Sequence, residues 1–219
     1  MIKVVLFDMD GTLVDTERLG IKAWDQVAVD LGISIPHEVS KSFIGHNKKD
    51  VLALCAACVG SEELAVDVYD RHMAYETEWA PTELETKEGA HECLHELSEA
   101  GFELGLVTSS RTETAKRRLG QFDLEPYFKL LTCGEEAENG KPAPDIYLKA
   151  AEKFGVAPEE CVVVEDSVNG ARAGLAAGMQ VFAIPDMVVL PDEVKDACAG
   201  VLDSLLEIPA AVAALNAAE

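Results

Sequence analysis

Basic residues are scarce in this sequence. Forty aspartates and glutamates stand against eighteen lysines and arginines among 219 residues, so the formal net charge is −22. Proteins that bind nucleic acids or anionic membranes present basic surfaces, and we therefore expect neither as a partner. If the ligand is an anion, its site must be locally positive despite this charge, which makes a bound divalent cation attractive.

Long hydrophobic runs are also missing. No stretch of about 18 or more consecutive apolar residues occurs, so a transmembrane helix is not expected. The first strand pattern begins at residue 2, without the basic segment, apolar stretch and cleavage site of a secretory signal peptide. We expect a cytoplasmic location.

The six cysteines do not form the pattern of a disulfide framework or a zinc site. Cys55 and Cys58 make one C-x-x-C pair, but it lies within an apolar helical pattern and has no second pair. Redox and zinc roles are therefore not favoured, and packing is the simpler interpretation.

Several common catalytic signatures are absent too. The sequence has no G-x-x-x-x-G-K-[ST] loop, no G-x-G-x-x-G after its first strand, and no G-x-S-x-G with a matched histidine. These absences argue against a P-loop enzyme, a dinucleotide site and a serine hydrolase.

What the sequence does contain is an alternation of strand and helix patterns. Five apolar segments are typical of buried strands: 2–8, 102–109, 129–133, 161–166 and 180–185. Helical patterns cover 88–100, 111–120, 144–154 and 167–177, and an alanine-rich helix is expected near 207–217. This alternation predicts an α/β fold with a Rossmann-like, three-layer core around a parallel sheet.

One long segment interrupts the alternation. Residues 16–85 show only helical patterns, and they are too many for a single crossover helix. We expect a helical cap domain over 16–85, inserted into a catalytic core made of 1–15 and 86–219. Ligands of open parallel sheets bind beyond the carboxyl ends of the strands, so the insertion should cover the site as a lid.

Polar side chains follow the predicted strands at their carboxyl ends. They are Asp8 and Asp10 after the first strand, Thr108, Ser109 and Ser110 after the second, Lys141 after the third, and Glu165, Asp166 and Ser167 after the fourth. Taken alone, Asp166 and Ser167 would be interpreted as a helix N-cap. The whole set instead indicates a Mg²⁺ site, since oxygen ligands suit this ion and histidine and cysteine are missing.

The chemistry that fits these groups is phosphoryl transfer, which depends on positioning and charge neutralisation. A carboxylate can attack phosphorus and form an aspartyl-phosphate. A second acid can protonate the leaving oxygen and then deprotonate water.

Four ordered motifs carry a family resemblance: FDMDGTLVDTE, LGLVTSS, NGKPAPDIY and VVVEDSVNGARAGLAAGM. With them the sequence resembles the haloacid dehalogenase-like superfamily, and within it the phosphatases and β-phosphoglucomutases that carry a small helical cap. The resemblance implies Asp8 as nucleophile, Asp10 as general acid and base, Thr108 with the Ser109 amide as phosphate ligands, and Lys141 as the cation beside them. It also implies Mg²⁺ held by Asp8, the Asp10 carbonyl and Asp166, with Glu165 binding directly or through water.

The cap departs from the β-phosphoglucomutase pattern at two places. Gly20 stands where the mutases have a histidine, and Gly45-His46-Asn47-Lys48 aligns with a loop that carries a phosphate-binding arginine. Lysine lacks the guanidinium fork. The resemblance therefore favours a phosphatase, with a phosphohexomutase as the alternative. A non-catalytic module is disfavoured because every catalytic position is filled.

The expected function is thus Mg²⁺-dependent hydrolysis of a small phosphorylated metabolite, with sugar phosphates as the preferred class, by a monomer. Substrate-binding candidates are Ser109, Ser110 and Arg111 in the core and Arg18, Lys22, His46, Asn47 and Lys48 in the cap. The alternative for each charged side chain is simple solvent exposure.

Overall fold

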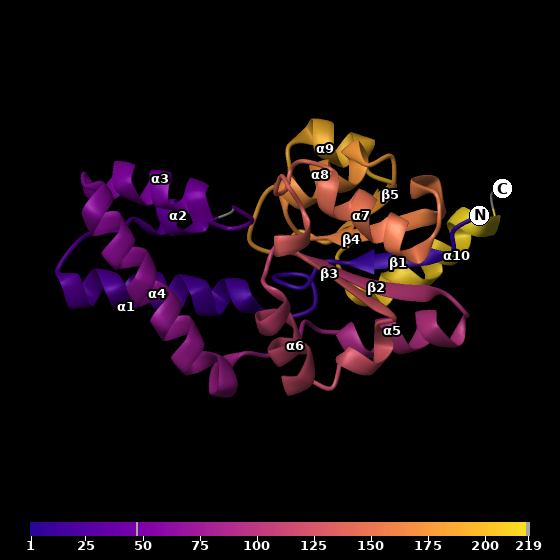
Figure 1. Ribbon diagram of the computed structural model, residues 1–219, viewed down its shortest axis with the longest axis horizontal. Helices are drawn as coiled ribbons and strands as arrows, with labels where there is room; N and C mark the ends of the chain where they lie inside the picture. The colour runs from indigo at the N-terminus through magenta and orange to yellow at the C-terminus, as the bar shows by residue number, and fades with distance from the viewer. Residues whose placement is uncertain (47, 218–219) are drawn as a thin grey trace. The chain divides into compact units, whose positions relative to one another are not determined.

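The computed structural model describes residues 1–46 and 48–217, which fold into two compact units. The first unit consists of Met1–Val14 together with Thr86–Glu219, and the second of Asp15–Glu85. The first is built around a β-sheet, whereas the described part of the second is helical (Figure 1).

The sheet of the first unit is parallel throughout. Its strands are β1 (Val4–Phe7), β2 (Glu103–Thr108), β3 (Leu130–Cys133), β4 (Cys161–Glu165), β5 (Gln180–Ala183) and β6 (Gly200–Val201), in the order β3-β2-β1-β4-β5-β6. All four residues of β1 are buried, as expected of a central strand that is covered on both faces. The α/β fold class predicted from the sequence is confirmed.

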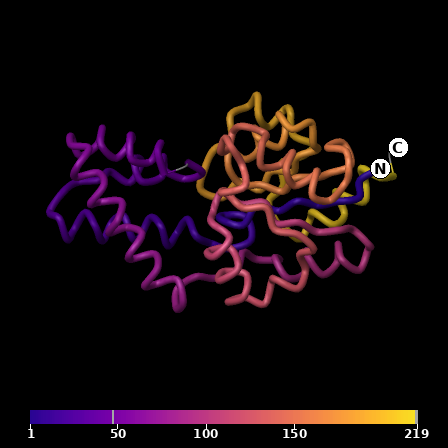
Figure 2. The backbone as a smooth tube through the Cα atoms, in the orientation of Figure 1, coloured from indigo at the N-terminus to yellow at the C-terminus, as the bar shows by residue number. Residues whose placement is uncertain are grey.

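Helices cover both faces of this sheet (Figure 1). The helices α5 (Ala90–Glu99), α6 (Thr112–Gln121) and α10 (Ile208–Ala217) form one layer, and α7 (Asp145–Phe154), α8 (Val168–Ala176) and α9 (Asp192–Ala197) form the other. Short 3₁₀ turns occur at Glu125–Tyr127, Gly134–Glu136, Pro158–Glu160 and Leu205–Glu207. Helix α10 lies beside the start of the chain (Figure 2), where the Ile2 amide donates to the Asn216 side chain at 2.6 Å.

Two elements of the first unit were not expected. The sequence after residue 185 is a polar stretch without a clear strand or helix pattern, but it contains α9 and the edge strand β6. A strand of two residues is too short to show the alternation of side chains by which strands are predicted.

The second unit has its own apolar core. Its helices are α1 (Thr16–Leu31), α2 (His37–Lys41), α3 (Lys48–Val59) and α4 (Glu62–Glu83). Trp24 packs edge-on against Phe43 and stacks on His72, with ring centroids 3.8 Å apart in the stacked pair. Burial lowers the pKa of His72 to about 4, so this imidazole is neutral at physiological pH. Cys55 is buried in the same core, where burial raises its pKa to about 11.

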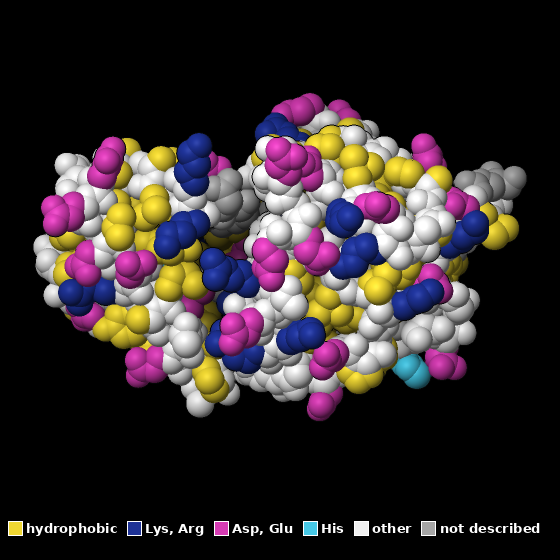
Figure 3. All heavy atoms as spheres, viewed as in Figure 1, with side chains coloured by type: hydrophobic (Ala, Val, Ile, Leu, Met, Phe, Trp, Pro, Cys, Tyr) yellow, Lys and Arg dark blue, Asp and Glu magenta, His cyan; other side chains and the backbone are white. Residues whose placement is uncertain are grey.

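The surface carries charged side chains of both signs, and the described helices are short or polar by membrane standards. On the face shown in Figure 3, lysines and arginines are interspersed with acidic side chains. Within the described residues, no helix combines the length and apolar character that crossing a bilayer requires.

Gly174 allows helix α8 to pack closely on the sheet. A Cβ atom at Gly174 would lie 2.9 Å from a Val181 methyl carbon and 3.2 Å from two methyl carbons of Val163. Real Cβ atoms do not approach side chains to 2.9 Å, so any larger residue would push α8 away from β4 and β5.

Gly174→Ala should therefore destabilise the first unit, although alanine normally stabilises a helix relative to glycine. We expect overpacking to lower the free energy of unfolding by about 1–3 kcal/mol. Gly120→Ala in α6 is the matched control, since its Cβ would meet no atom within 4 Å and should stabilise by about 0.5–1 kcal/mol. Urea unfolding followed by circular dichroism measures both, and equal stabilisation by the two substitutions would contradict this account of α8.

Candidate active site

The candidate site lies at the carboxyl edge of the parallel sheet. Phe7, the last residue of β1, pairs with Leu106 of β2 and Val164 of β4. The residues that follow these three positions therefore come to one edge of the sheet. The Asp8 amide continues the ladder by donating to the Val164 carbonyl at 3.0 Å.

The turn after β1 explains why two aspartates occur with one residue between them. Met9 is fully buried, so Asp8 and Asp10 are carried on the other side of the chain from a core residue. Gly11 has φ +84°, a conformation that glycine adopts without strain. Its amide donates to the Val14 carbonyl at 2.8 Å, which closes the turn.

Lys141 connects the carboxylates of β1 and β4. Its ammonium lies 2.6 Å from Asp8 Oδ1 and 2.5 Å from Glu165 Oε1, and all three side chains are buried. It also donates to the Val107 carbonyl at 3.4 Å. Burial acts to lower the pKa of Lys141, but the two carboxylates outweigh it and the pKa is raised well above its usual value. Lys141 is therefore charged.

Glu165 is held at both of its carboxylate oxygens. Besides Lys141, Oε1 accepts a hydrogen bond of 2.8 Å from the hydroxyl of Tyr147. Oε2 accepts from the amide and hydroxyl of Ser167, at 3.3 and 3.1 Å. Gly170 makes room for this carboxylate, since a Cβ there would lie about 2 Å from all three atoms of the group.

Tyr147 is a functional candidate that the sequence analysis missed. It lies on α7, six residues after Lys141, and it is fully buried. A buried tyrosine hydroxyl needs a hydrogen-bond partner. The indication available in the sequence was that Tyr147 lies in the same motif as Lys141, NGKPAPDIY.

Asp8, Glu165 and Asp166 together could hold a metal ion. One carboxylate oxygen of each lies within 4.8 Å of the others, and all three residues are buried. The Thr12 hydroxyl donates to Asp166 Oδ1 at 3.0 Å and orients that carboxylate. Burial, opposed by Lys141, raises the pKa of Asp8 well above its usual value, so a cation here would favour the ionised form of this carboxylate.

The composition of the site fits a hard divalent cation. Counted with every group ionised, the network holds four carboxylates and two cationic side chains, a formal excess of two negative charges: Asp8, Asp10, Glu165 and Asp166 against Lys141 and Arg118. The available ligands are all oxygens, as Mg²⁺ prefers.

Asp10 is held by a separate set of side chains. Its Oδ2 accepts hydrogen bonds from the Ser110 hydroxyl at 2.8 Å and from the Thr108 hydroxyl at 3.3 Å. Its Oδ1 forms an ion pair with the guanidinium of Arg118 on α6. Arg118 was not among the predicted site residues.

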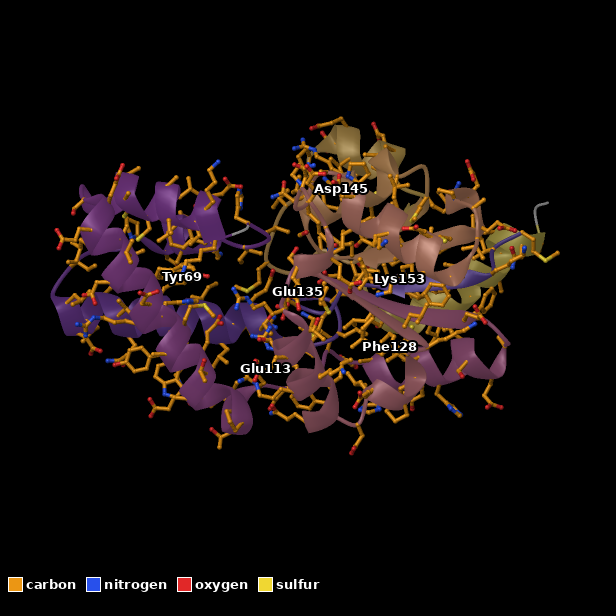
Figure 4. The ribbon with its side chains drawn as sticks, viewed as in Figure 1. Tyr69, Glu113, Phe128, Glu135, Asp145 and Lys153 are labelled. Atoms are coloured by element: carbon orange, nitrogen blue, oxygen red, sulfur yellow. The ribbon has the colours of Figure 1, made fainter. Side chains whose placement is uncertain are left out.

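The loop after β2 is fixed from the neighbouring strand. The Ser110 amide donates to the Thr108 hydroxyl at 3.0 Å. A Cβ at Gly134, just after β3, would lie 2.3 Å from the Ser109 carbonyl oxygen, so only glycine fits there. Glu135, labelled in Figure 4, extends from the same turn and accepts hydrogen bonds from the amide and hydroxyl of Thr112 at the start of α6. Arg111 precedes this helix and is exposed.

The predicted cap residues belong to the second unit. His46 and Lys48 are exposed, and Asn47 lies outside the described residues. Lys48 lies 3.9 Å from Asp70 and 4.7 Å from the ring centre of Tyr69, a residue labelled in Figure 4. Arg18 pairs with Asp15, and Lys22 with Glu83. The structure thus brings most of the predicted core residues together, with Arg111 exposed at the start of α6, while the predicted cap residues form their own surface contacts.

Comparison with known proteins agrees with this arrangement. The sequence model for haloacid dehalogenase-like hydrolases matches residues 5–184. A phosphorylated carbohydrates phosphatase from Thermotoga maritima is 32% identical over 179 residues, which cover 81% of this chain and 82% of that protein. Hexitol phosphatase A from Escherichia coli is 35% identical over 182 residues, covering 83% and 82%.

A solved structure resembles most of the chain. CbbY from Rhodobacter sphaeroides, crystallised in complex with phosphate, superposes with a TM-score of 0.77 and 25% identity, over 95% of this chain and 96% of that one. The match of the family's sequence model and the similarity to relatives above 30% identity confirm the resemblance seen in the four motifs. This chain belongs to the haloacid dehalogenase-like hydrolase family.

Proposed function

We propose that the protein is a Mg²⁺-dependent phosphatase that hydrolyses a small phosphorylated metabolite through an aspartyl-phosphate, with sugar phosphates as the preferred substrates. The observation that carries the proposal is the buried Asp8 carboxylate beside the Lys141 ammonium, with Asp10 two residues away. This substrate class is supported by the two relatives described above, which are named as a phosphorylated carbohydrates phosphatase and a hexitol phosphatase.

In the first step a carboxylate oxygen of Asp8 attacks phosphorus, and the bond between phosphorus and the leaving oxygen breaks. Asp10, which must be protonated when the substrate binds, gives its proton to that oxygen, so an alcohol leaves and Asp8 carries the phosphoryl group. Asp10 then removes a proton from water, the hydroxide attacks the phosphoryl group, and inorganic phosphate leaves with Asp8 restored. The Lys141 ammonium offsets negative charge at Asp8 throughout.

The residues that would hold Mg²⁺ are Asp8, Asp166 and the Asp10 carbonyl. The Glu165 oxygens already accept hydrogen bonds, so we expect Glu165 to contribute through water. When bound, the ion would neutralise charge on the phosphoryl oxygens. We further propose that residues 16–85 serve as the cap and contribute substrate recognition through His46, Asn47 and Lys48.

Hydrolysis and isomerisation can be separated in one experiment. Glucose 1-phosphate, with and without a sugar bisphosphate primer, is followed by phosphorus NMR. We expect release of inorganic phosphate in both cases. Clean conversion to the 6-phosphate would instead establish the alternative, a phosphohexomutase.

Chelation with EDTA should abolish turnover and added Mg²⁺ should restore it, whereas activity that survives chelation would remove the metal from the proposal.

The roles of the two aspartates predict different leaving-group dependence. Asp8→Asn should lower turnover of all phosphate esters by about 10³-fold or more, because it removes the nucleophile. Asp10→Asn should slow alkyl phosphates by about 10²–10⁴-fold but p-nitrophenyl phosphate far less, because p-nitrophenolate leaves without a proton. Steady-state kinetics on both substrates measures this, and equal losses in Asp10→Asn would exclude proton transfer to the leaving group.

The hydroxyl of Tyr147 should matter for turnover through Glu165 and Lys141. Tyr147→Phe removes a buried hydrogen bond to a charged group, so we expect the free energy of unfolding to fall by about 1–3 kcal/mol. We also expect kcat to fall by about tenfold with little change in KM. Tyr127→Phe, which removes a hydroxyl from a partly exposed turn, is the matched control. Lower stability with unchanged kcat would mean that the hydroxyl serves packing alone.

A further inference from the structure

Arg118 is a buried arginine that extends from helix α6 to the site. It is 8% exposed and lies on the inner face of α6 with Ala115 and Leu119, which are fully buried. Arg117, the preceding residue, is exposed on the same helix. Burying a guanidinium is costly unless the charge is paired. The carboxylate of Asp10 is one partner that the structure provides for it.

The contacts around Asp10 fix its carboxylate at both oxygens. Arg118 holds Oδ1, while the hydroxyls of Thr108 and Ser110 donate to Oδ2. A carboxylate with only the two hydroxyl contacts, both on one oxygen, could still swing its other oxygen about the side-chain bonds. The ion pair from α6 removes that freedom, because it holds the second oxygen from a different element of the fold.

A group that transfers a proton must be held within hydrogen-bonding reach of the oxygen that receives it, and small errors of position reduce the rate strongly. We propose that Arg118 is a positioning residue for Asp10: it holds the carboxylate in one orientation beside the loop after β2, so that Asp10 is presented to the leaving group. This inference rests on the proposed phosphatase function. Arg118 acts through Asp10 and is not assigned any contact with the substrate.

The inference predicts a loss that depends on the leaving group. Arg118→Met keeps an apolar side chain for the buried stem and removes the ion pair. We expect kcat/KM for an alkyl sugar phosphate to fall by about 10–100-fold. The leaving group of p-nitrophenyl phosphate needs no proton, so its kcat/KM should change less than threefold, about 0.6 kcal/mol or less. Arg117→Met removes the same charge from the exposed side of α6 and should leave both rates unchanged.

A double substitution separates positioning from a general structural role. If Arg118 acts through Asp10, then Arg118→Met should cause no further loss in kcat/KM for the alkyl substrate once Asp10→Asn is present. The inference is overturned if the losses from Arg118→Met and Asp10→Asn multiply in the double variant. It is also overturned if Arg118→Met alone lowers kcat/KM equally for both substrates. Arg118→Lys retains the charge with a single donor and should recover part of the lost rate. If circular dichroism shows that Arg118→Met does not fold, the Arg118→Lys comparison on the two substrates decides in its place.

Failure of this inference differs from failure of the proposed function. If the wild-type protein releases no phosphate, or Asp10→Asn does not discriminate between the substrates, the proposed function fails. If Asp10→Asn discriminates and Arg118→Met does not, only the role of Arg118 fails.

Discussion

The structure of the site depends on the Lys141 ammonium. Asp8 follows β1, Glu165 ends the adjacent strand β4, and both are buried, an arrangement in which like charges repel. Lys141 lies within 2.6 Å of both carboxylates, so the pair becomes a triad with one excess negative charge. Removing a single member of such a buried network leaves an uncompensated charge, which typically costs about 3–5 kcal/mol. The close approach of Asp8 and Glu165 at the ends of β1 and β4 therefore depends on the segment that carries Lys141.

Close approach of the backbone is the second requirement. The Glu165 carboxylate fits only because Gly170 has no Cβ, and the loop after β2 approaches the end of β3 only because of Gly134. Both contacts bring charged or polar groups nearer than any other residue type would permit. Gly170 of the fourth motif therefore has a steric role at the site, and α8 has as its N-cap Ser167, which also holds Glu165.

The fold and most core site residues could be predicted because both depend on simple patterns. Buried parallel strands are continuous apolar runs, and their carboxyl ends meet at one edge, so Asp8, Lys141 and Glu165 can be grouped from the order of residues alone. Arg118 could not, because it is the third of three basic residues in KRR and only the rotation of α6 buries it while Arg117 stays exposed. Tyr147 was missed for a similar reason, since an aromatic residue on an apolar helix face looks like packing.

The two aspartates of the first turn differ in what holds them, and this difference matches their proposed roles. Asp8 pairs with a lysine that is itself fixed by a second carboxylate, and only 9% of its side chain is exposed. Asp10 pairs with an arginine and two hydroxyls, and 29% of its side chain is exposed. A nucleophile benefits from a fixed, water-free position, whereas a group that gives and takes protons needs access to the leaving oxygen and to water. One residue of spacing, with Met9 in the core between them, is enough to give two like acids these separate environments.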